Sequence, residues 1–523
     1  MKRLSKDNIR EILSKRFEGD EFVTLSSIPP PHSFKDITKA SSRIKRAIDN
    51  GEKITVVGDY DVDGVVSSVI MREFFDDIGI DIDLIIPNRF RDGYGINEKL
   101  LDRIDADLII TVDNGISAVG AAKVCKERGI DLIITDHHTV PDTIPDAYAI
   151  VNPKQSDCNF PSSEICGAQV AWYLVAELKS VLNIKYDLSK FLDILALAIV
   201  ADMMELRGMN RIMVKRGFIM INQSKRAVFS AVKKFFRKDS FKSDDISFLL
   251  SPIINSAGRI EDASLSYELL RSKNERDAYM RLEYIVSLNN DRKDIELNLF
   301  GESLSFHNKD TNIIVAWGEN WHQGVIGIVA ARLVRKFHKP AIVFSVNDGI
   351  AKGSARSIGN INILELVAAQ KEFLMGYGGH KGAAGMSIRV ENLEPFKKAL
   401  EKHSLNINKD DFLEREVILG EIDPSCIDFE LLDILESFEP YGQKNPQPIF
   451  ILKNAFVKHN KILGANANHQ KLILESENHT IESLYFNFDE EISTGDKIDI
   501  ICSISKNEFR GLVTPQVLLK EIL

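Results

Sequence analysis

Residues 53–79 have the sequence KITVVGDYDVDGVVSSVIMREFFDDIG, in which an apolar run leads into an acidic turn and then into a helical pattern. The run KITVVG predicts a buried strand, and VVSSVIMREFFDDIG predicts the helix that follows it. Comparable apolar runs recur at 82–86, 108–112 and 131–135. Strands that alternate with helices in this way predict a doubly wound α/β domain with a parallel sheet.

Acidic residues and histidines follow three of these predicted strands. The motifs are GDYDVDG (58–64), TVDNG (111–115) and TDHH (135–138), and two later motifs, IVAD (199–202) and GGHKGAAG (378–385), have a similar character. Ligands of doubly wound domains bind at the carboxyl edge of the sheet, where the ends of the parallel strands meet. We therefore expect the acidic side chains to form one site at that edge.

Carboxylates at this density predict a site for divalent cations. Asp59, Asp61 and Asp63 alternate, so on a continuing strand they would share one face, although the turn before the helix makes that geometry approximate. At least two of them can reach one ion. Mg²⁺ and Mn²⁺ prefer oxygen ligands, and an imidazole from His137 or His138 shifts the balance toward Mn²⁺. Two such ions about 4 Å apart activate water and stabilise the leaving oxygen in phosphoryl transfer. Taken singly, each of these aspartates could instead be a turn or cap residue.

The rest of the chain predicts further domains, because 523 residues exceed what one core supports. From the N-terminus we expect a helical segment, the parallel-sheet domain, a helical connector that begins with a basic stretch, a second and smaller α/β domain, a linker rich in Pro, Gly and Asn, and a small β-barrel of the OB type. The expected bounds are 1–45, 46–205, 206–306, 307–405, 406–449 and 450–523.

Composition argues against some classes of protein. No apolar segment reaches the roughly 18 residues of a membrane span. The basic N-terminus has no apolar core behind it, unlike a secretory signal, so we expect a cytoplasmic protein. The five cysteines form no CxxC pair and are expected to be reduced thiols. The net charge of −10 gives no general attraction to nucleic acid. Carboxylates that bind metal contribute to this negative charge, and divalent cations would offset them, so the net charge does not exclude a DNA substrate.

DYDVDG, TVDNG, TDHH and IVAD resemble the successive motifs of the DHH phosphoesterases, and GGHKGAAG resembles the signature of the DHHA1 domain found with them. Within that superfamily, further stretches resemble the RecJ family of single-stranded-DNA-specific exonucleases. These are IPNRFRDGYGIN (86–97), VNPKQSDCNFP (151–161), NSAGRIEDAS (255–264), WHQGVIGIVAARL (321–333), KGSARSI (352–358) and FEPYGQKNPQPIF (438–450).

The resemblance implies a 5′-to-3′ exonuclease that releases 5′ mononucleotides from single-stranded DNA in repair and recombination, with two Mn²⁺ or Mg²⁺ ions per site. Single-strand-binding protein and a helicase are implied as partners. The implied metal ligands are Asp61, Asp63, Asp113, His137 and Asp202. Asp59 and Asp136 are implied either as occasional ligands or as residues that contact the ligands without binding metal. His138 would donate a proton or contact phosphate. The implied substrate contacts are Arg259, Ser354, Arg356, His380 and Gly379.

Two other functions remain open at this stage. The chain could be a DHH phosphoesterase for short oligonucleotides or cyclic dinucleotides, or a non-catalytic scaffold at replication forks. The OB-like barrel favours a longer polymer, which Lys458, Lys461, Lys471 and Phe509 would track. Retention of every expected ligand argues against a scaffold.

Some residues depart from the family pattern or have an alternative role. Ile253 stands where the family commonly has arginine, and Glu205 stands where it tends to have proline. A lone Arg259 or Arg356 would more often form a surface salt bridge. Trp321 could be a stacking platform for bases or part of the core.

Overall fold

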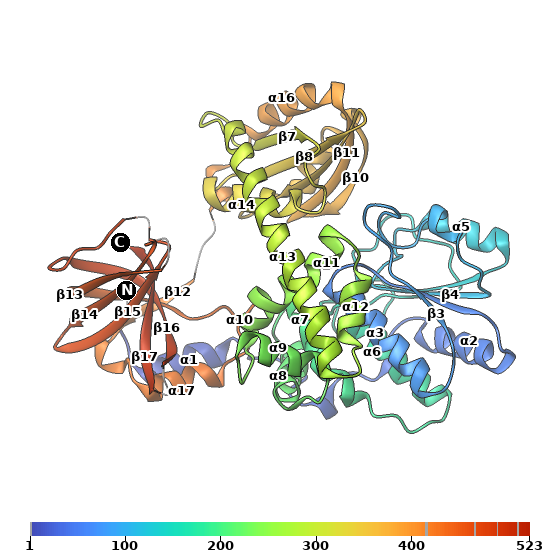
Figure 1. Ribbon diagram of the computed structural model, residues 1–523, viewed down its shortest axis with the longest axis horizontal. Helices are drawn as coiled ribbons and strands as arrows, with labels where there is room; N and C mark the ends of the chain where they lie inside the picture. Colours follow the sequence, from blue (N-terminus) through green and yellow to red (C-terminus); the bar gives the residue numbers. More distant parts are fainter. Residues whose placement is uncertain (1–2, 414–416, 465–466, 489, 510–511) are drawn as a thin grey trace. The chain divides into compact units, whose positions relative to one another are not determined.

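The structure is a computed structural model, which describes residues 3–413, 417–464, 467–488, 490–509 and 512–523. The chain divides into two compact units. The smaller unit comprises Met1–Ile28, Met203–Arg216 and Glu416–Leu523, and the larger comprises Pro29–Asp202 and Gly217–Arg415. Figure 1 shows both units and labels many of their helices and strands.

A parallel five-stranded sheet lies at the centre of the first part of the larger unit (Figure 1). Its strand order is β3-β2-β4-β5-β6, so the order reverses between β2 and β4, and every neighbouring pair is parallel. This confirms the predicted doubly wound sheet. The strands are β2 (Ile54–Val57), β3 (Asp83–Ile85), β4 (Leu108–Val112), β5 (Asp131–Thr135) and β6 (Ala149–Val151). We did not predict β6, because three residues are too few to show a period.

Helices cover both faces of this sheet. Three helices, α2, α3 and α6, pack together on one face, and α7 packs on α3, whereas α4 and α5 pack together on the other face. Helix α3 is apolar nearly all round because the sheet, α6 and α7 surround it. The bounds are α2 (Ile37–Asn50), α3 (Val62–Asp77), α4 (Glu98–Leu101), α5 (Val119–Arg128), α6 (Gly167–Val181) and α7 (Leu192–Ala201).

The predicted helical connector is present. Its interior is apolar, and it buries Ile253 and Ile254, which are 3% and 5% exposed. The isoleucine at the family's arginine position therefore packs in the interior. The helices are α8 (Gly208–Gln223), α9 (Ala227–Phe236), α10 (Ser243–Asp245), a π-helical turn (Ile246–Leu250), α11 (Ser251–Ile260), α12 (Ser264–Leu270) and α13 (Glu275–Ser303).

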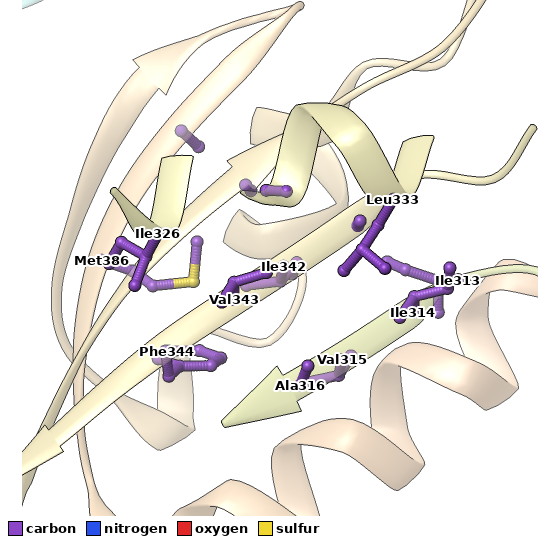
Figure 2. Packing of buried hydrophobic residues seen from close by; sticks show 14 of the residues in the cluster. Ile313, Ile314, Val315, Ala316, Ile326, Leu333, Ile342, Val343, Phe344 and Met386 are labelled. Carbon is purple, nitrogen blue, oxygen red and sulfur yellow. The ribbon is translucent and has the colours of Figure 1, made fainter. Parts of the chain in front are cut away.

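The second sheet of the larger unit has the order β10-β11-β9-β8-β7, and only β7 and β8 are parallel. Figure 2 shows Ile326 and Leu333 of α14 beside the strand that carries Ile342 and Val343. Trp321 belongs to this core, and its Nε1 donates to Glu302 at 2.7 Å, so it is no platform for bases. The elements are β7 (Ile314–Glu319), α14 (Ile326–Phe337), β8 (Ala341–Asn347), β9 (Ile350–Arg356), α15 (Ile363–Ala368), β10 (Leu374–His380), β11 (Ala383–Arg389) and α16 (Leu393–Ser404).

The smaller unit contains the predicted OB-type barrel, which is confirmed. Five strands follow the order β13-β14-β15-β17-β16, and β16 pairs again with β13 to close the barrel. At the N-terminus, β1 pairs with β12, and Ile9 and Leu13 of α1 are fully buried in the barrel's hydrophobic cluster. The elements are β1 (Arg3–Leu4), α1 (Lys6–Lys15), β12 (Ile418–Ile422), α17 (Phe429–Ser437), β13 (Ile449–Leu463), β14 (His469–Ser476), β15 (His479–Phe486), β16 (Lys497–Phe509) and β17 (Leu512–Ile522).

Two composition-based expectations can be compared with this fold. Within the described residues, none of the helices has both the length and the apolar character that crossing a bilayer requires. All five cysteines are free, as expected.

Candidate active site

The acidic motif after β2 forms a turn and the start of a helix. Strand β2 ends at Val57 and α3 begins at Val62, so Asp59, Asp61 and Asp63 do not continue along a strand. Asp61 is the N-cap of α3, and its Oδ1 accepts the N–H groups of Asp63 at 2.9 Å and Gly64 at 3.1 Å. The turn expected before the helix is therefore present, and the alternation of the three aspartates is only approximately that of a strand.

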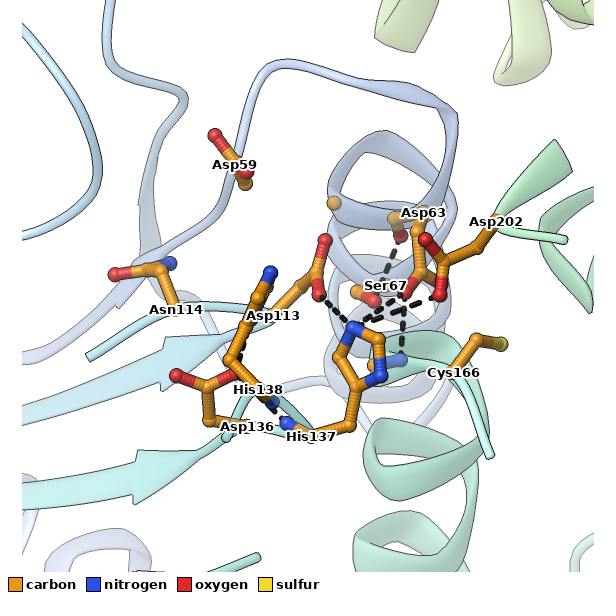
Figure 3. A network of polar contacts seen from close by, with 12 residues as sticks. Asp59, Asp63, Ser67, Asp113, Asn114, Asp136, His137, His138, Cys166 and Asp202 are labelled. Atoms are coloured by element: carbon orange, nitrogen blue, oxygen red, sulfur yellow. Dashed lines mark hydrogen bonds and ion pairs between the residues drawn. The ribbon is translucent and has the colours of Figure 1, made fainter. Parts of the chain in front are cut away.

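His137 lies at the centre of three carboxylates from three other segments of the chain (Figure 3). Its Nε2 is 3.2 Å from Oδ1 of Asp113, 3.6 Å from Oδ2 of Asp63 and 3.6 Å from Oδ2 of Asp202. Asp113 and His137 follow β4 and β5, Asp63 lies in the first turn of α3, and Asp202 is the C-cap of α7. Their potential ligand atoms form overlapping groups, which are Asp63–His137–Asp202, Asp59–Asp61–Asp113 and Asp113–His137–His138.

Several polar atoms in this group have no hydrogen-bond partner among the described residues. They are Oδ1 of Asp113, Nδ1 of His137 and Oδ2 of Asp202, all shielded from solvent. Burial, together with the charge of Asp63 and the other nearby carboxylates, raises the pKa of Asp113 well above its usual range, and the same causes raise the pKa of Asp202. Buried polar atoms without partners are costly. A divalent cation would satisfy the unpartnered carboxylate oxygens and neutralise the charge, so the residues present fit a metal centre.

Asp136 and His138 have a different environment from these candidate ligands. Oδ1 of Asp136 accepts the backbone N–H of His137 at 2.7 Å and lies 2.7 Å from Nδ1 of His138, and Oδ2 accepts the N–H of Ile116 at 2.9 Å. Burial opposes the charge on His138, but the bond to Asp136 and the surrounding carboxylates raise the pKa of His138 to about 9. The oxygens of Asp136 are thus used within the protein, where they orient His138.

Asn114, which sequence reasoning missed, connects strands at the edge of the sheet where the site forms. Its Nδ2 donates to the carbonyls of Val57 at 3.1 Å and Val112 at 2.9 Å, and its Oδ1 accepts the N–H of Ile96 at 3.0 Å. It therefore joins the ends of β2 and β4 at the reversal in strand order. The NG pair in TVDNG is a turn signal, but it does not indicate the bond to β2.

Arg259, Ser354 and Arg356 lie together near the start of α14. Nη1 of Arg259 donates to the carbonyl of Gly324 at 3.2 Å, and Nη1 of Arg356 donates to Oγ of Ser354 at 3.1 Å. A Cβ on Gly327, in the first turn of α14, would lie 2.9 Å from Oγ of Ser354 and 3.0 Å from Nη2 of Arg356. A helix N-terminus and two arginines at one place are typical of a phosphate site.

The charge of this group, which we call the arginine pocket, is only partly offset by the chain, through the charge of Asp61 acting on Arg259. Among the described residues, neither Arg259 nor Arg356 forms an ion pair with a carboxylate. Burial and the charges of Arg89 and Arg356 lower the pKa of Arg259 to about 10, and burial lowers the pKa of Arg356. The pocket is therefore suited to an anion, and the surface salt bridges considered as an alternative are not observed.

Arg89 is a second residue that sequence reasoning missed. Its guanidinium stacks over the ring of Tyr60 at 4.0 Å, and its Nε donates to the carbonyl of Gly258 at 3.3 Å. It thereby connects the loop after β3 with α11, beside Arg259. The resemblance of IPNRFRDGYGIN was a signal for a functional loop, but it gave no role to this arginine.

His380 and Gly379 end β10, beside the arginine pocket. Ala383 pairs with His380 on one side and with Arg356 on the other, so the three residues project from the same face of the sheet. Burial and the charges of Arg356 and His138 lower the pKa of His380. His380 thus lies within electrostatic reach of both the arginine pocket and His138. At Gly379, where φ is +149°, a side chain would overlap the carbonyl of Ala383.

The barrel lysines named from the sequence are partly neutralised. Lys458 forms an ion pair with Glu475, and Lys471 forms one with Glu482 at 2.8 Å. Lys461 lies opposite Lys471 on the neighbouring strand. On the next strand, Phe486 packs edge-on against His469, with ring centroids 5.2 Å apart. The side chain of Phe509 lies outside the described residues.

Three family models match the chain in order. The model of the DHH family N-terminal domain matches residues 53–199, the DHHA1 domain matches 310–403, and the RecJ OB domain matches 418–521. The first covers the parallel sheet and the candidate metal ligands up to His138. The second covers Ser354, Arg356 and the β10–β11 hairpin, and the third covers the barrel.

Curated relatives and solved structures match over most of the chain. The single-stranded-DNA-specific exonuclease RecJ of Escherichia coli (strain K12) is 32% identical over 94% of this chain and 91% of that protein. The RecJ of Bacillus subtilis (strain 168) is 34% identical over 94% of this chain, which spans 64% of that relative's length. The crystal structure of RecJ from Thermus thermophilus in complex with Mn²⁺ aligns with a TM-score of 0.86 and 25% identity, over 99% of this chain and 75% of that chain. A structure of RecJ from the same organism in complex with Mg²⁺ has the same fold, with a TM-score of 0.80 and 24% identity, over 99% of this chain and 74% of that chain.

Proposed function

Because the chain belongs to the RecJ family of single-stranded-DNA-specific exonucleases, we propose that it removes nucleotides one at a time from the 5′ end of single-stranded DNA. One observation carries this proposal. The larger unit contains both a carboxylate group that fits divalent cations and an arginine pocket that suits an anion. A strand with a 5′ phosphate supplies that anion and also a phosphodiester for hydrolysis.

The metal centre would use the ligands implied by the resemblance. We assign Asp61, Asp63, Asp113, His137 and Asp202 to two Mn²⁺ or Mg²⁺ ions, with Asp59 next to them. When bound, the two ions supply activation of water and charge stabilisation at the leaving oxygen. His138, oriented by Asp136, would donate a hydrogen bond to an oxygen of the phosphate under attack.

The arginine pocket would set the polarity of digestion. Arg259, Ser354 and Arg356 would hold the terminal 5′ phosphate, because a guanidinium offers a planar fork to phosphate oxygens. His380 and the bare backbone at Gly379 would contact the nucleotide between that phosphate and the metal centre. Each cleavage would release a 5′ mononucleotide and expose a new 5′ phosphate for the same pocket.

The wider setting is also part of the proposal. The OB-type barrel would bind the strand beyond the site, with Lys461 and Phe486 on its outer face. We propose single-strand-binding protein and a helicase as partners, and DNA repair and recombination in the cytoplasm as the setting. The family resemblance supports these assignments.

The direct test is a digestion of strands that differ in end, pairing and sugar. Single-stranded DNA, duplex DNA and RNA, each with a 5′ phosphate and a label at one end, are incubated with Mn²⁺ or Mg²⁺, and the products are separated by chromatography. We expect labelled mononucleotides from the 5′ end of single-stranded DNA, only when a metal ion is present. Release from the 3′ end, or equal digestion of the duplex, would contradict the proposal.

The same assay separates the two rival functions. A phosphoesterase for short substrates would hydrolyse a dinucleotide as fast as a long strand, whereas contacts with the barrel favour the long strand. A scaffold would hydrolyse neither. Equal kcat/KM for a dinucleotide and a strand of about 30 nucleotides, well above the roughly 4–16 nucleotides that one OB fold binds, would therefore favour the first rival.

A further inference from the structure

The first two residues of α6 hold one of the proposed metal ligands. The backbone N–H of Gly167 donates to Oδ2 of Asp63 at 2.6 Å, and the N–H of Ala168 donates to Oδ1 at 2.8 Å. Figure 3 shows Asp63 at this point, near Cys166 at the start of α6. Both oxygens of one carboxylate thus accept amides from a single helix N-terminus.

This arrangement fixes Asp63 without help from a metal ion. The first N–H groups of a helix have no partner within the helix, and the helix dipole favours a negative charge at this end. Each carboxylate oxygen accepts more than one bond, so an oxygen that accepts one amide keeps a lone pair for a cation. Asp113 and Asp202 differ, because each has an oxygen without a hydrogen-bond partner.

The same glycine also limits the position of Asp113. A Cβ on Gly167 would lie 2.6 Å from Cβ and 2.7 Å from Cγ of Asp113, and closer still to its Oδ1. Atoms do not approach so closely, so any side chain at residue 167 would displace the Asp113 carboxylate. The backbone of Asp113 is already constrained, since its φ is +63°. The fold therefore needs a residue without a side chain at 167 for Asp113 to keep its place.

We propose that Gly167 is a positioning residue for the metal centre, which sets the distance between Asp63 and Asp113. Its amide holds the ligand from α3, and its missing side chain makes room for the ligand that follows β4. The inference rests on the proposed role of both aspartates as ligands. It adds a residue that binds no metal itself but determines how well the centre binds one.

The test is a metal titration of the full chain without DNA. Mn²⁺ binding is followed by the electron paramagnetic resonance signal of the free ion, which is lost on binding. We expect Gly167→Ala to weaken Mn²⁺ binding about 10-fold or more, as is typical when residues that orient metal ligands are changed. Binding of a 5′-phosphorylated strand without metal, measured by fluorescence anisotropy, should stay within about twofold, because the arginine pocket is unchanged.

Gly217→Ala is the matched control. Gly217 lies in α8, and a Cβ there would overlap Cβ of Ala196 and the carbonyl of Leu192, so the substitution introduces similar crowding between helices. It should lower the thermal stability but leave Mn²⁺ affinity unchanged. Equal loss of Mn²⁺ affinity in both variants would reduce Gly167 to a general packing residue and overturn the proposal.

A second variant covers the case in which Gly167→Ala does not fold. Ala168→Pro removes the N–H that Asp63 accepts and adds nothing to residue 167, and proline is tolerated in the first helical turn. It should also weaken Mn²⁺ binding. Unchanged affinity in a folded variant of either kind overturns the proposal. If the wild-type chain binds no Mn²⁺, the proposed function fails instead, so the two failures are distinguishable.

Discussion

The carboxylate group at the edge of the first sheet and the arginine pocket beside the second sheet both hold like charges close together. The charges are negative in the first region and positive in the second. In the first, burial and mutual repulsion raise the pKa of Asp113 and Asp202 well above the usual range. In the second, burial and neighbouring arginines lower the pKa of Arg259 to about 10. Each region collects like charges that destabilise one another. Groups with strongly shifted pKa values cluster at functional sites, and a ligand of opposite charge would stabilise each region.

The two regions also differ in how the chain builds them. The carboxylate group takes its members from the ends of β4 and β5 and from the ends of helices α3 and α7. The arginine pocket combines the end of α11, strand β9 and the N-terminus of α14. Arg259 bonds to the carbonyl of Gly324 just before α14, whereas Arg356 bonds to Ser354 within β9 itself. The comparison predicts that changes to the first region act on catalysis, whereas changes to the second act on the choice of strand end.

The largest effect is expected from Asp113→Ala. Asp113 belongs to two of the three candidate ligand groups, so its loss affects both proposed ions. We expect kcat with Mn²⁺ to fall by about 10³-fold or more, while binding of single-stranded DNA without metal is retained. Single-turnover digestion of a labelled strand, together with anisotropy for binding, measures both quantities.

The control for Asp113→Ala must account for its backbone. Asp348 also has a positive φ, of 50° against 63° for Asp113, but it lies in the turn between β8 and β9. Asp348→Ala carries the same kind of backbone strain and should leave kcat unchanged. If Asp113→Ala retained more than about a tenth of the wild-type rate, its assignment as a ligand would be wrong.

An intermediate effect is expected from Arg356→Ala. Loss of a half-buried arginine that would bind phosphate should raise KM for a 5′-phosphorylated strand by about 10- to 100-fold and change kcat much less. A strand with a 5′ hydroxyl should be affected little, because it has no terminal phosphate to lose. Arg335→Ala, at an exposed arginine of α14, is the control. Equal losses on both kinds of strand would show that Arg356 does not read the 5′ end.

The sequence predicted the parts of both regions that depend on strand ends and motifs. Apolar runs predicted β2, β4 and β5, and the doubly wound pattern predicted that Asp113 and His137 would meet at one edge. Asp202 follows α7, more than 60 residues after His137; its motif was grouped with the other acidic motifs from the sequence, and the resemblance then assigned both residues to one metal centre. The roles of all these residues in binding metal remain predictions.

Other features were beyond sequence reasoning because they depend on contacts between distant segments. Asn114 bonds to the end of β2 through its side chain, and Gly167 matters for the space that it leaves to Asp113. Similarly, β1 pairs with β12 more than 400 residues later, which neither periodicity nor composition indicates. Such constraints become visible only when coordinates show which atoms would collide or remain unpaired.

The smallest effect of a substitution is expected at Lys154, a basic residue beside the carboxylate group. It follows β6, and its loop is tied to the metal centre because Asn152 donates to the carbonyl of His138 at 3.0 Å and accepts the N–H of Lys154 at 2.8 Å. Its charge opposes the raised pKa of Asp202 and contributes to the lowered pKa of His380. A lysine so placed would contact the phosphate backbone of the strand.

Lys154→Ala should therefore weaken strand binding about 3- to 10-fold and reduce the slope of log Kd against log salt by about 1, with kcat nearly unchanged. Lys154→Arg should keep both the affinity and the slope, whereas Lys185→Ala, at an exposed lysine, serves as the control. Anisotropy at several salt concentrations provides the measurement. An unchanged slope would mean that Lys154 does not contact the phosphate backbone. The carboxylate region would then contact the strand only through its metal ions, and strand binding would depend on the arginine pocket more than we propose.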